Sequence, residues 1–309
     1  MLNLLRAELL RLISNRKMAV LGAFVLGLGF WISASMAVTL KPYTALEWEE
    51  AQRQSNDAQI NLEVICGSSS SSSDCTALPT NITVEGFLRP QMGFEQFVVA
   101  SLELTMQMGL LIMVVLITVM VGAEFSTGAI GTQLTFTPRR LPLLWAKALA
   151  SAICGICLMA FWAALMVLLG VFFYLNVRGI EGLSAGSLLG AQVGRALLAG
   201  AVMGMLAALV TMALASTVKT WVLISAGLAL SQFLESSRDI AQTVWLLPTA
   251  NVLSFVNGEW SRTIYNSDGV RQEPVPHLDY GYSLGYVVFW LVVIGIWASV
   301  SFSRRNILK

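Results

Sequence analysis

Few residues in this chain have the chemistry of a catalytic or metal site. The only histidine, His277, lies in a polar stretch, so the chain alone cannot build a histidine metal site or a Ser-His-Asp triad. Cys154 and Cys157 form a C-x-x-C, but they lie in an apolar run without a second cysteine pair. We interpret them as small apolar side chains of a helix. The sequence therefore predicts no catalytic, cofactor-binding or metal residues, and no enzyme activity in this chain.

The sequence also predicts no nucleotide site. A phosphate-binding P-loop needs a glycine-rich turn followed by lysine and then serine or threonine. Among the five lysines only Lys219 has such a neighbour, Thr220, and the residues before it lack the glycines. If ATP drives this protein, another chain must bind the nucleotide.

The composition is that of a membrane protein. Of the 309 residues, 56% are hydrophobic and 12% are charged, against about 25% charged in ordinary globular domains. The mean hydropathy is +0.71. A bilayer-spanning helix needs about 20 predominantly apolar residues. The sequence therefore predicts an all-α integral membrane protein, a single transmembrane domain over 1–309, with six spans at 18–39, 96–121, 147–175, 191–215, 221–236 and 281–301.

The charges predict the orientation of these spans. Lysine and arginine concentrate in the N-terminal segment, in the loops after the second and fourth spans, and in the C-terminal tail. Because such loops stay in the cytoplasm, we expect both termini there and the segments 40–95 and 237–280 outside. The protein is thus predicted to be a multi-pass protein of the cytoplasmic membrane, from a bacterium. Residues 1–17 are predicted to form an interfacial elbow helix, with a cytoplasmic extension of the first span as the alternative.

The two outer segments have different patterns. In the first, residues 45–65 have the pattern of a water-facing helix, and Cys66 and Cys75 then flank a run of six serines. A disulfide between these cysteines would add roughly 3 kcal/mol of stability; two free thiols are the alternative. In the second, Ile240–Val256 is apolar but too interrupted to span, and it predicts a re-entrant or interfacial helical hairpin before the last span.

Polar residues within the spans are candidates for function. Glu103 and Gln107 are one helical turn apart in the second span. Together with Met106 and Gln232 they are candidates for lining a substrate route; structural roles near the span boundaries are the alternative. The pattern Gly200-x-x-x-Gly204 predicts close helix packing, within one subunit or across a dimer.

The stretch Gly122–Lys147 separates two long apolar runs and is rich in glycine, with a basic end. Ser126 or Thr127 can cap the start of a short helix, and Pro138 can end it. Such a helix would carry three apolar side chains as knobs for a partner, and its glycines would allow close approach of a partner's backbone. The apolar residues are Phe125, Ile130 and Leu134, and the glycines are Gly128 and Gly131.

This stretch resembles the first cytoplasmic loop of ABC-2 family permeases, the membrane subunits of one class of ABC exporter. The residues that match the family pattern are Glu124, Gly128, Ile130, Leu134, Pro138, Arg140 and Lys147, and Ala129 departs from it because the family usually has threonine there. The resemblance implies a coupling helix that docks onto a separate ATPase. Its docking residues would be Glu124, Phe125, Ser126, Thr127, Gly128, Ile130, Gly131 and Leu134, and Arg139, Arg140 and Lys147 would anchor it to the membrane face.

The resemblance also implies a function and partners. We expect a permease subunit of an ATP-driven exporter that moves an amphiphilic drug, lipid or peptide outward. Two ATPase chains would bind ATP and Mg, and the permease would pair with itself or with a related permease, in contact with membrane lipid and not with nucleic acid. The alternatives are a membrane sensor or immunity protein that binds an extracellular ligand, and an ATP-independent secondary transporter, although paired repeats and midplane charges are not evident.

Overall fold

A computed structural model describes residues 27–68, 83–88, 91–136, 139–180, 182–184, 186–236, 244–261 and 277–304. The predicted elbow helix at 1–17 lies outside the described residues. So do Cys75, and with it the predicted disulfide, and Pro138.

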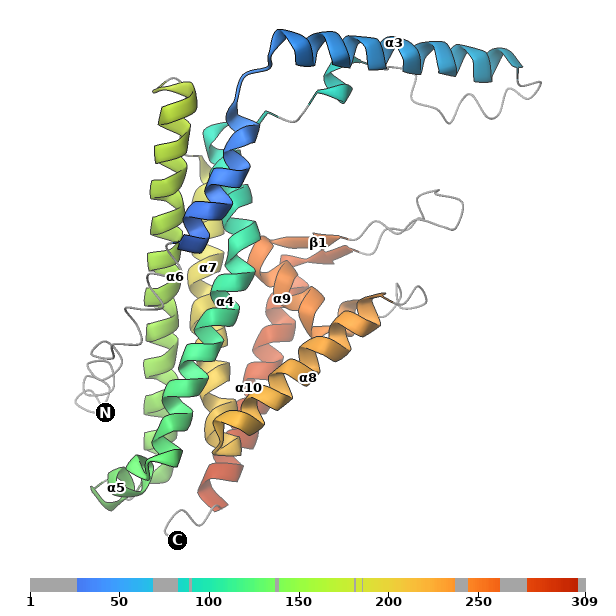
Figure 1. Ribbon diagram of the computed structural model, residues 1–309. Helices are drawn as coiled ribbons and strands as arrows, with labels where there is room; N and C mark the ends of the chain where they lie inside the picture. Colours follow the sequence, from blue (N-terminus) through green and yellow to red (C-terminus); the bar gives the residue numbers. More distant parts are fainter. Residues whose placement is uncertain are drawn as a thin grey trace.

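The described chain is an all-α bundle apart from one small β hairpin (Figure 1). Five of its helices are long and apolar enough to cross a membrane, at the positions of the second to sixth predicted spans. A shorter apolar helix, Gly27–Leu40, coincides with the end of the first predicted span, whose beginning lies outside the described residues. The five long helices are α4 (Phe94–Ser126), α6 (Arg140–Arg178), α7 (Ser187–Leu214), α8 (Thr217–Ser236) and α10 (Tyr280–Arg304).

Helix α7 is central and packs against α4, α6 and α10. Its closest approach is to α6, where a Cβ added to Gly155 would overlap the carbonyl oxygen of Gly200. A Cβ on Gly204 would come within 2.6 Å of the carbonyl oxygen of Ser151. The Gly200-x-x-x-Gly204 pattern therefore serves packing within the subunit, because its small residues let the two backbones touch.

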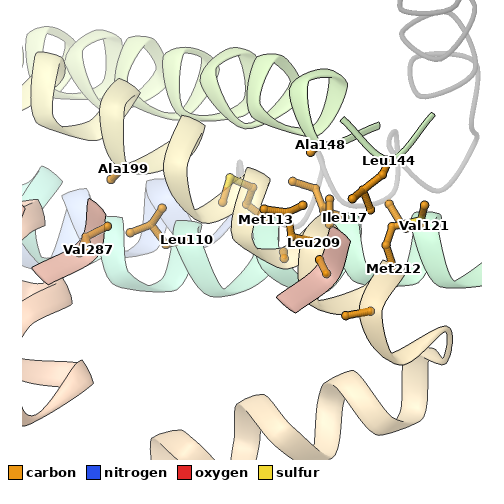
Figure 2. Close-up of a cluster of buried hydrophobic side chains, with 14 of the residues drawn as sticks. Leu110, Met113, Ile117, Val121, Leu144, Ala148, Ala199, Leu209, Met212 and Val287 are labelled. Atoms are coloured by element: carbon orange, nitrogen blue, oxygen red, sulfur yellow. The ribbon is translucent and has the colours of Figure 1, made fainter. Parts of the chain in front are cut away.

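The buried core lies between α4, α6, α7 and α10. Figure 2 shows part of it, a cluster that includes Leu110, Met113, Ile117, Leu209 and Val287. A second cluster joins Phe97, Leu102, Trp162 and Met166 with Leu40, the last residue of the first apolar helix. The two clusters together keep α4 and α6 in contact with their neighbours over much of their length.

One end of the bundle, which we call the α3 end, carries helix α3 (Ala45–Ser68) and the 3-10 turn η2 (Val84–Phe87). Helix α3 runs across this end, at a steep angle to the long helices (Figure 1). Its start is a capping box: the backbone N–H of Thr44 donates to Glu47, and the N–H of Glu47 donates to the Thr44 hydroxyl. The helix expected at 45–65 is confirmed, with Glu49 and Glu50 exposed.

The segment before α10 contains the 3-10 turn η4 (Val244–Leu246), the short helix α9 (Pro248–Asn257) and a hairpin of β1 (Glu259–Ser261) and β2 (His277–Asp279). The strands pair antiparallel, with Trp260 opposite Leu278. Pro248 occupies the first turn of α9, where its missing N–H costs nothing. Gly258 ends α9 with a φ of +98°, which glycine adopts readily. Of the predicted hairpin at Ile240–Val256, the described residues show one helix and a 3-10 turn.

The opposite end, which we call the α5 end, carries the short helix α5 (Ala129–Phe136). It lies at the tip of the bundle where α4 ends and α6 begins (Figure 1).

Candidate functional site

The connection between α4 and α6 is much shorter than Gly122–Lys147. Helix α4 continues through Gly122 to Ser126, and α6 begins at Arg140. Only 127–139 lies between them, and α5 occupies most of it. The predicted spans end at residue 121 and begin again at residue 147, whereas α4 and α6 continue past these positions, because the charged residues beside the apolar runs are accommodated inside the helices.

Ser126 and Thr127 close the end of α4 instead of capping the start of α5. Both hydroxyls donate to the carbonyl oxygen of Ala123, at 2.9 Å each. Gly128 then reverses the chain with a φ of +72°, which a residue with a side chain rarely adopts. The predicted N-cap role is therefore wrong: the hydroxyls add to the bond that the Ala123 carbonyl already accepts from the backbone N–H of Thr127, at 3.0 Å.

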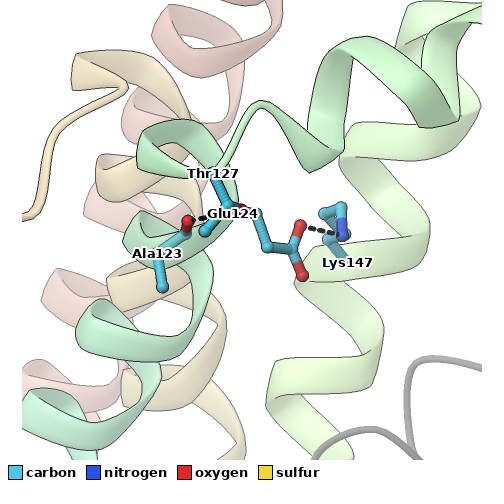
Figure 3. A network of polar contacts seen from close by, with 4 residues as sticks. All are labelled: Ala123, Glu124, Thr127 and Lys147. Carbon is cyan, nitrogen blue, oxygen red and sulfur yellow. Dashed lines mark hydrogen bonds and ion pairs between the residues drawn. The ribbon is translucent and has the colours of Figure 1, made fainter.

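Glu124 and Lys147 form a buried ion pair between α4 and α6 (Figure 3). Lys147 Nζ lies 2.5 Å from Glu124 Oε2, and the two residues are 3% and 7% exposed. Burying either charge alone would be costly, and each is stabilised by the other. The sequence predicted Glu124 as a docking residue and Lys147 as an anchor at the membrane face, whereas the structure buries both side chains in this pair.

The apolar residues of α5 face the protein's own core. Ile130 is 1% exposed and Leu134 is 8% exposed, and both belong to the cluster with Val121, Leu143 and Leu144. Phe125 is half-buried against the same cluster, and Gly131 is half-buried with open space beside it. The prediction that Ile130 and Leu134 are knobs for a partner is wrong. The exposed residues on this side are Ser126, Thr127, Gly128, Thr132 and Thr135.

The two arginines after α5 differ in their contacts. Arg139 is exposed. Arg140 donates from a guanidinium nitrogen to the carbonyl oxygen of Ser303, at 3.0 Å, and so joins the start of α6 to the end of α10. A cation at the C-terminal end of a helix is favourable because the carbonyl oxygens there carry partial negative charge.

The four candidates for a substrate route do not share one surface. Met106 is fully buried in the core. Gln107 of α4 and Gln232 of α8 are exposed, and Glu103 is partly buried. Helices α4 and α8 are in contact where Gly122 lies against Thr217, at the end of α4 and the start of α8. Glu103, Gln107 and Gln232 lie away from this contact and remain candidates.

Polar residues around α9 form a set of contacts that sequence reasoning largely missed. Arg195 of α7 donates to the carbonyl oxygen of Asn257 at 2.9 Å and lies 5.5 Å from the ring centre of Tyr280. Gln192, one turn earlier, donates to the carbonyl oxygen of Val256. Gln192 was missed, although a glutamine in an apolar helix one turn from an arginine is a detectable signal.

The long apolar helices and the buried polar contacts between them define an all-α, multi-pass membrane protein. A family model described as "Protein of unknown function (DUF2705)" matches residues 78–308, and the chain belongs to this family. Searches of curated proteins and of solved structures returned no match.

Proposed function

We propose that this protein is the permease subunit of an ATP-driven exporter, with α5 as the helix that receives the ATPase. In this proposal the α5 end faces the cytoplasm, the α3 end faces outward, and the first apolar helix completes six spans. The proposal is supported by the resemblance of Glu124–Lys147 to ABC-2 permeases and by the absence of a P-loop from the sequence.

The observation that carries the proposal is the attachment of α5 to the end of α4 and to the buried core of the bundle. Ile130 and Leu134 bury α5 against the core. The Glu124–Lys147 pair then ties α4 to α6 directly beside it. A displacement of α5 would therefore move the ends of α4 and α6 together, which is the mechanical property that a coupling helix needs.

The contacts of α5 also change the expected docking surface. Since Ile130 and Leu134 are buried, the partner would contact the hydroxyl-rich side formed by Ser126, Thr127, Thr132 and Thr135. Short hydroxyl side chains let a partner's backbone come close and offer donors and acceptors for it. Arg139, which is exposed beside this side, would add a positive charge.

Helix α8 supports pairing of two permeases. In its most apolar window 11% of the residues are buried, against 56% for α7. In the proposed complex α8 would lie against α4 of a second permease, identical or related, with two ATPase chains below that bind ATP and Mg. Gln107 and Gln232 would then lie near the junction, where an amphiphilic drug, lipid or peptide would leave.

Co-purification with an ATPase encoded next to this chain tests the docking surface. Thr132→Arg places a bulky charge on the exposed side of α5, and we expect it to abolish co-purification and substrate-stimulated ATP hydrolysis in reconstituted vesicles. Thr83→Arg is the matched control, because Thr83 is also exposed but lies at the α3 end. Retained ATPase binding by the well-folded Thr132→Arg variant would contradict the assignment of α5 as the docking helix.

A second candidate function, binding of an extracellular ligand without transport, is favoured by a cavity at the α3 end. The same reconstituted complex separates the two functions, since a sensor would bind its ligand without moving it across the membrane.

A further inference from the structure

A cavity of about 190 Å³ lies between the first turns of α3 and the turn η2. Its walls include Tyr43, Glu47, Glu50 and Gln54 on one side and Phe87 on the other. Helix α3, which forms one wall of this cavity, lies at the other end of the bundle from α5 (Figure 1). Binding of a ligand in this cavity can therefore be tested separately from the proposed ATP-driven transport.

Two carboxylates face this cavity from one side of α3. Glu47 and Glu50 are three residues apart, which places them on the same helical face. The backbone N–H and the hydroxyl of Thr44 both donate to Glu47 Oε2, at 2.7 and 3.0 Å, and hold this carboxylate at the wall. Among the described residues Glu50 has no hydrogen-bond or ion-pair partner. Helix α3 as a whole has five acidic residues and one arginine, so its field attracts cations.

Aromatic rings line the same cavity. Tyr43 and Phe87 both contribute to its walls. The ring of Tyr43 packs edge-on against Trp48, with ring centres 5.9 Å apart, which restricts its orientation. Aromatic faces bind weakly hydrated cations, such as alkylammonium groups, more strongly than strongly hydrated metal ions, because a weakly hydrated cation loses less hydration energy when it contacts the ring.

We propose that this cavity binds a small organic ammonium group, such as the head of choline. The carboxylates of Glu47 and Glu50 supply the negative charge, and the rings of Tyr43 and Phe87 contact the alkyl groups on the nitrogen. Its volume is below the roughly 300 Å³ at which drug-sized sites begin. The ammonium group can belong to a soluble amine or to the headgroup of a membrane lipid, and the experiment distinguishes these sources.

Binding of radiolabelled choline to the full chain tests the proposal, in nanodiscs of phosphatidylglycerol, which has no ammonium group. We expect saturable binding that tetramethylammonium displaces and that dimethylbutanol, the neutral isostere of choline, does not. In phosphatidylcholine nanodiscs, loss of this binding would assign the site to lipid headgroups, and retained binding would assign it to soluble amines. Absence of saturable choline binding in phosphatidylglycerol would overturn the proposal.

Matched variants separate the cavity from the general charge of α3. Glu50→Gln and Phe87→Leu should each weaken choline binding about tenfold. Glu49→Gln removes the same charge from the neighbouring position outside the cavity wall, and its affinity should stay within about twofold of the unchanged chain. Equal weakening by Glu49→Gln and Glu50→Gln would mean that diffuse attraction, and not the cavity, holds the cation. Unchanged thermal unfolding of each variant excludes loss of the fold as the cause.

Discussion

The two ends of the bundle differ in their contacts of charged side chains, with a buried pair at the α5 end and half-buried residues toward the α3 end. At the α5 end, Glu124 and Lys147 pair side chain to side chain. Toward the α3 end, charged side chains contact helix termini: Arg195 bonds a carbonyl oxygen at the end of α9, and Glu95 accepts the N–H of Leu189 in the first turn of α7. Arg178 likewise donates to the carbonyl oxygen of Leu40.

This difference predicts different sensitivity to substitution. If one member of a buried ion pair is removed, a charge remains without compensation in a low-dielectric environment. If a side chain that contacts a helix end is removed, the remaining group is a neutral amide or carbonyl, whose loss of a partner costs less. The α5 end should therefore be the more fragile of the two.

The largest effect is expected for Lys147→Met, which leaves Glu124 buried without its partner. We expect a loss of about 3–5 kcal/mol in the free energy of unfolding. Unfolding in mixed detergent micelles, followed by circular dichroism, measures it.

The double variant Glu124→Gln/Lys147→Met is the control for this prediction, because it removes both charges. It should recover most of the lost stability. A Lys147→Met chain as stable as the unchanged protein would show that the pair contributes little and would remove the contrast between the ends.

An intermediate effect is expected for Arg195→Met at the other end. The change removes the bond to the Asn257 carbonyl and the contact with Tyr280, and the two groups that lose these contacts are uncharged. We expect a loss of about 1.5–3 kcal/mol in the same unfolding measurement. Arg53→Met on exposed α3 is the matched control and should change stability by less than about 0.5 kcal/mol. A loss for Arg195→Met as large as that for Lys147→Met would contradict the distinction between the two ends.

The smallest effect is expected for Glu95→Ala, which removes the acceptor for the Leu189 N–H at the start of α7. Loss of such a cap costs about 1 kcal/mol. Glu85→Ala, which removes an exposed carboxylate from η2, is the control. If both alanine variants unfold alike, Glu95 does not stabilise α7 in the way that the contact indicates.

The helices were predictable because the bilayer imposes a simple requirement on sequence. A span must be apolar over about 20 residues, and the runs that became α4, α6, α7, α8 and α10 satisfy this at nearly the predicted positions. The pattern of Gly200 and Gly204 likewise predicts a close helix crossing. Its partner, Gly155 of α6, is not specified by that pattern.

The limits of sequence reasoning appear at Lys147. A lysine beside an apolar run indicates the end of a span, because a lone charge in the membrane is expensive. Glu124, 23 residues away, forms an ion pair with Lys147 and so offsets the free-energy cost of burying the lysine charge. The sequence contains both residues but not the distance between them, so the helix boundaries were placed too far from α5.

The stretch between α4 and α6 separates what the amino-acid sequence determines from what only the tertiary structure determines. By itself, the sequence determined that a short helix lies between two long apolar helices, because local pattern and composition specify such elements. Phe125, which was predicted on this short helix, lies in the last turn of α4. Only the tertiary structure decided that Ile130 and Leu134 turn into the core and that Glu124 and Lys147 pair. Burial of an apolar face gains about the same free energy in the protein's own core as in a partner. The helical spacing of the apolar residues is therefore compatible with either outcome. The packing of α5 in the folded chain decides that its apolar face is buried in the protein's own core.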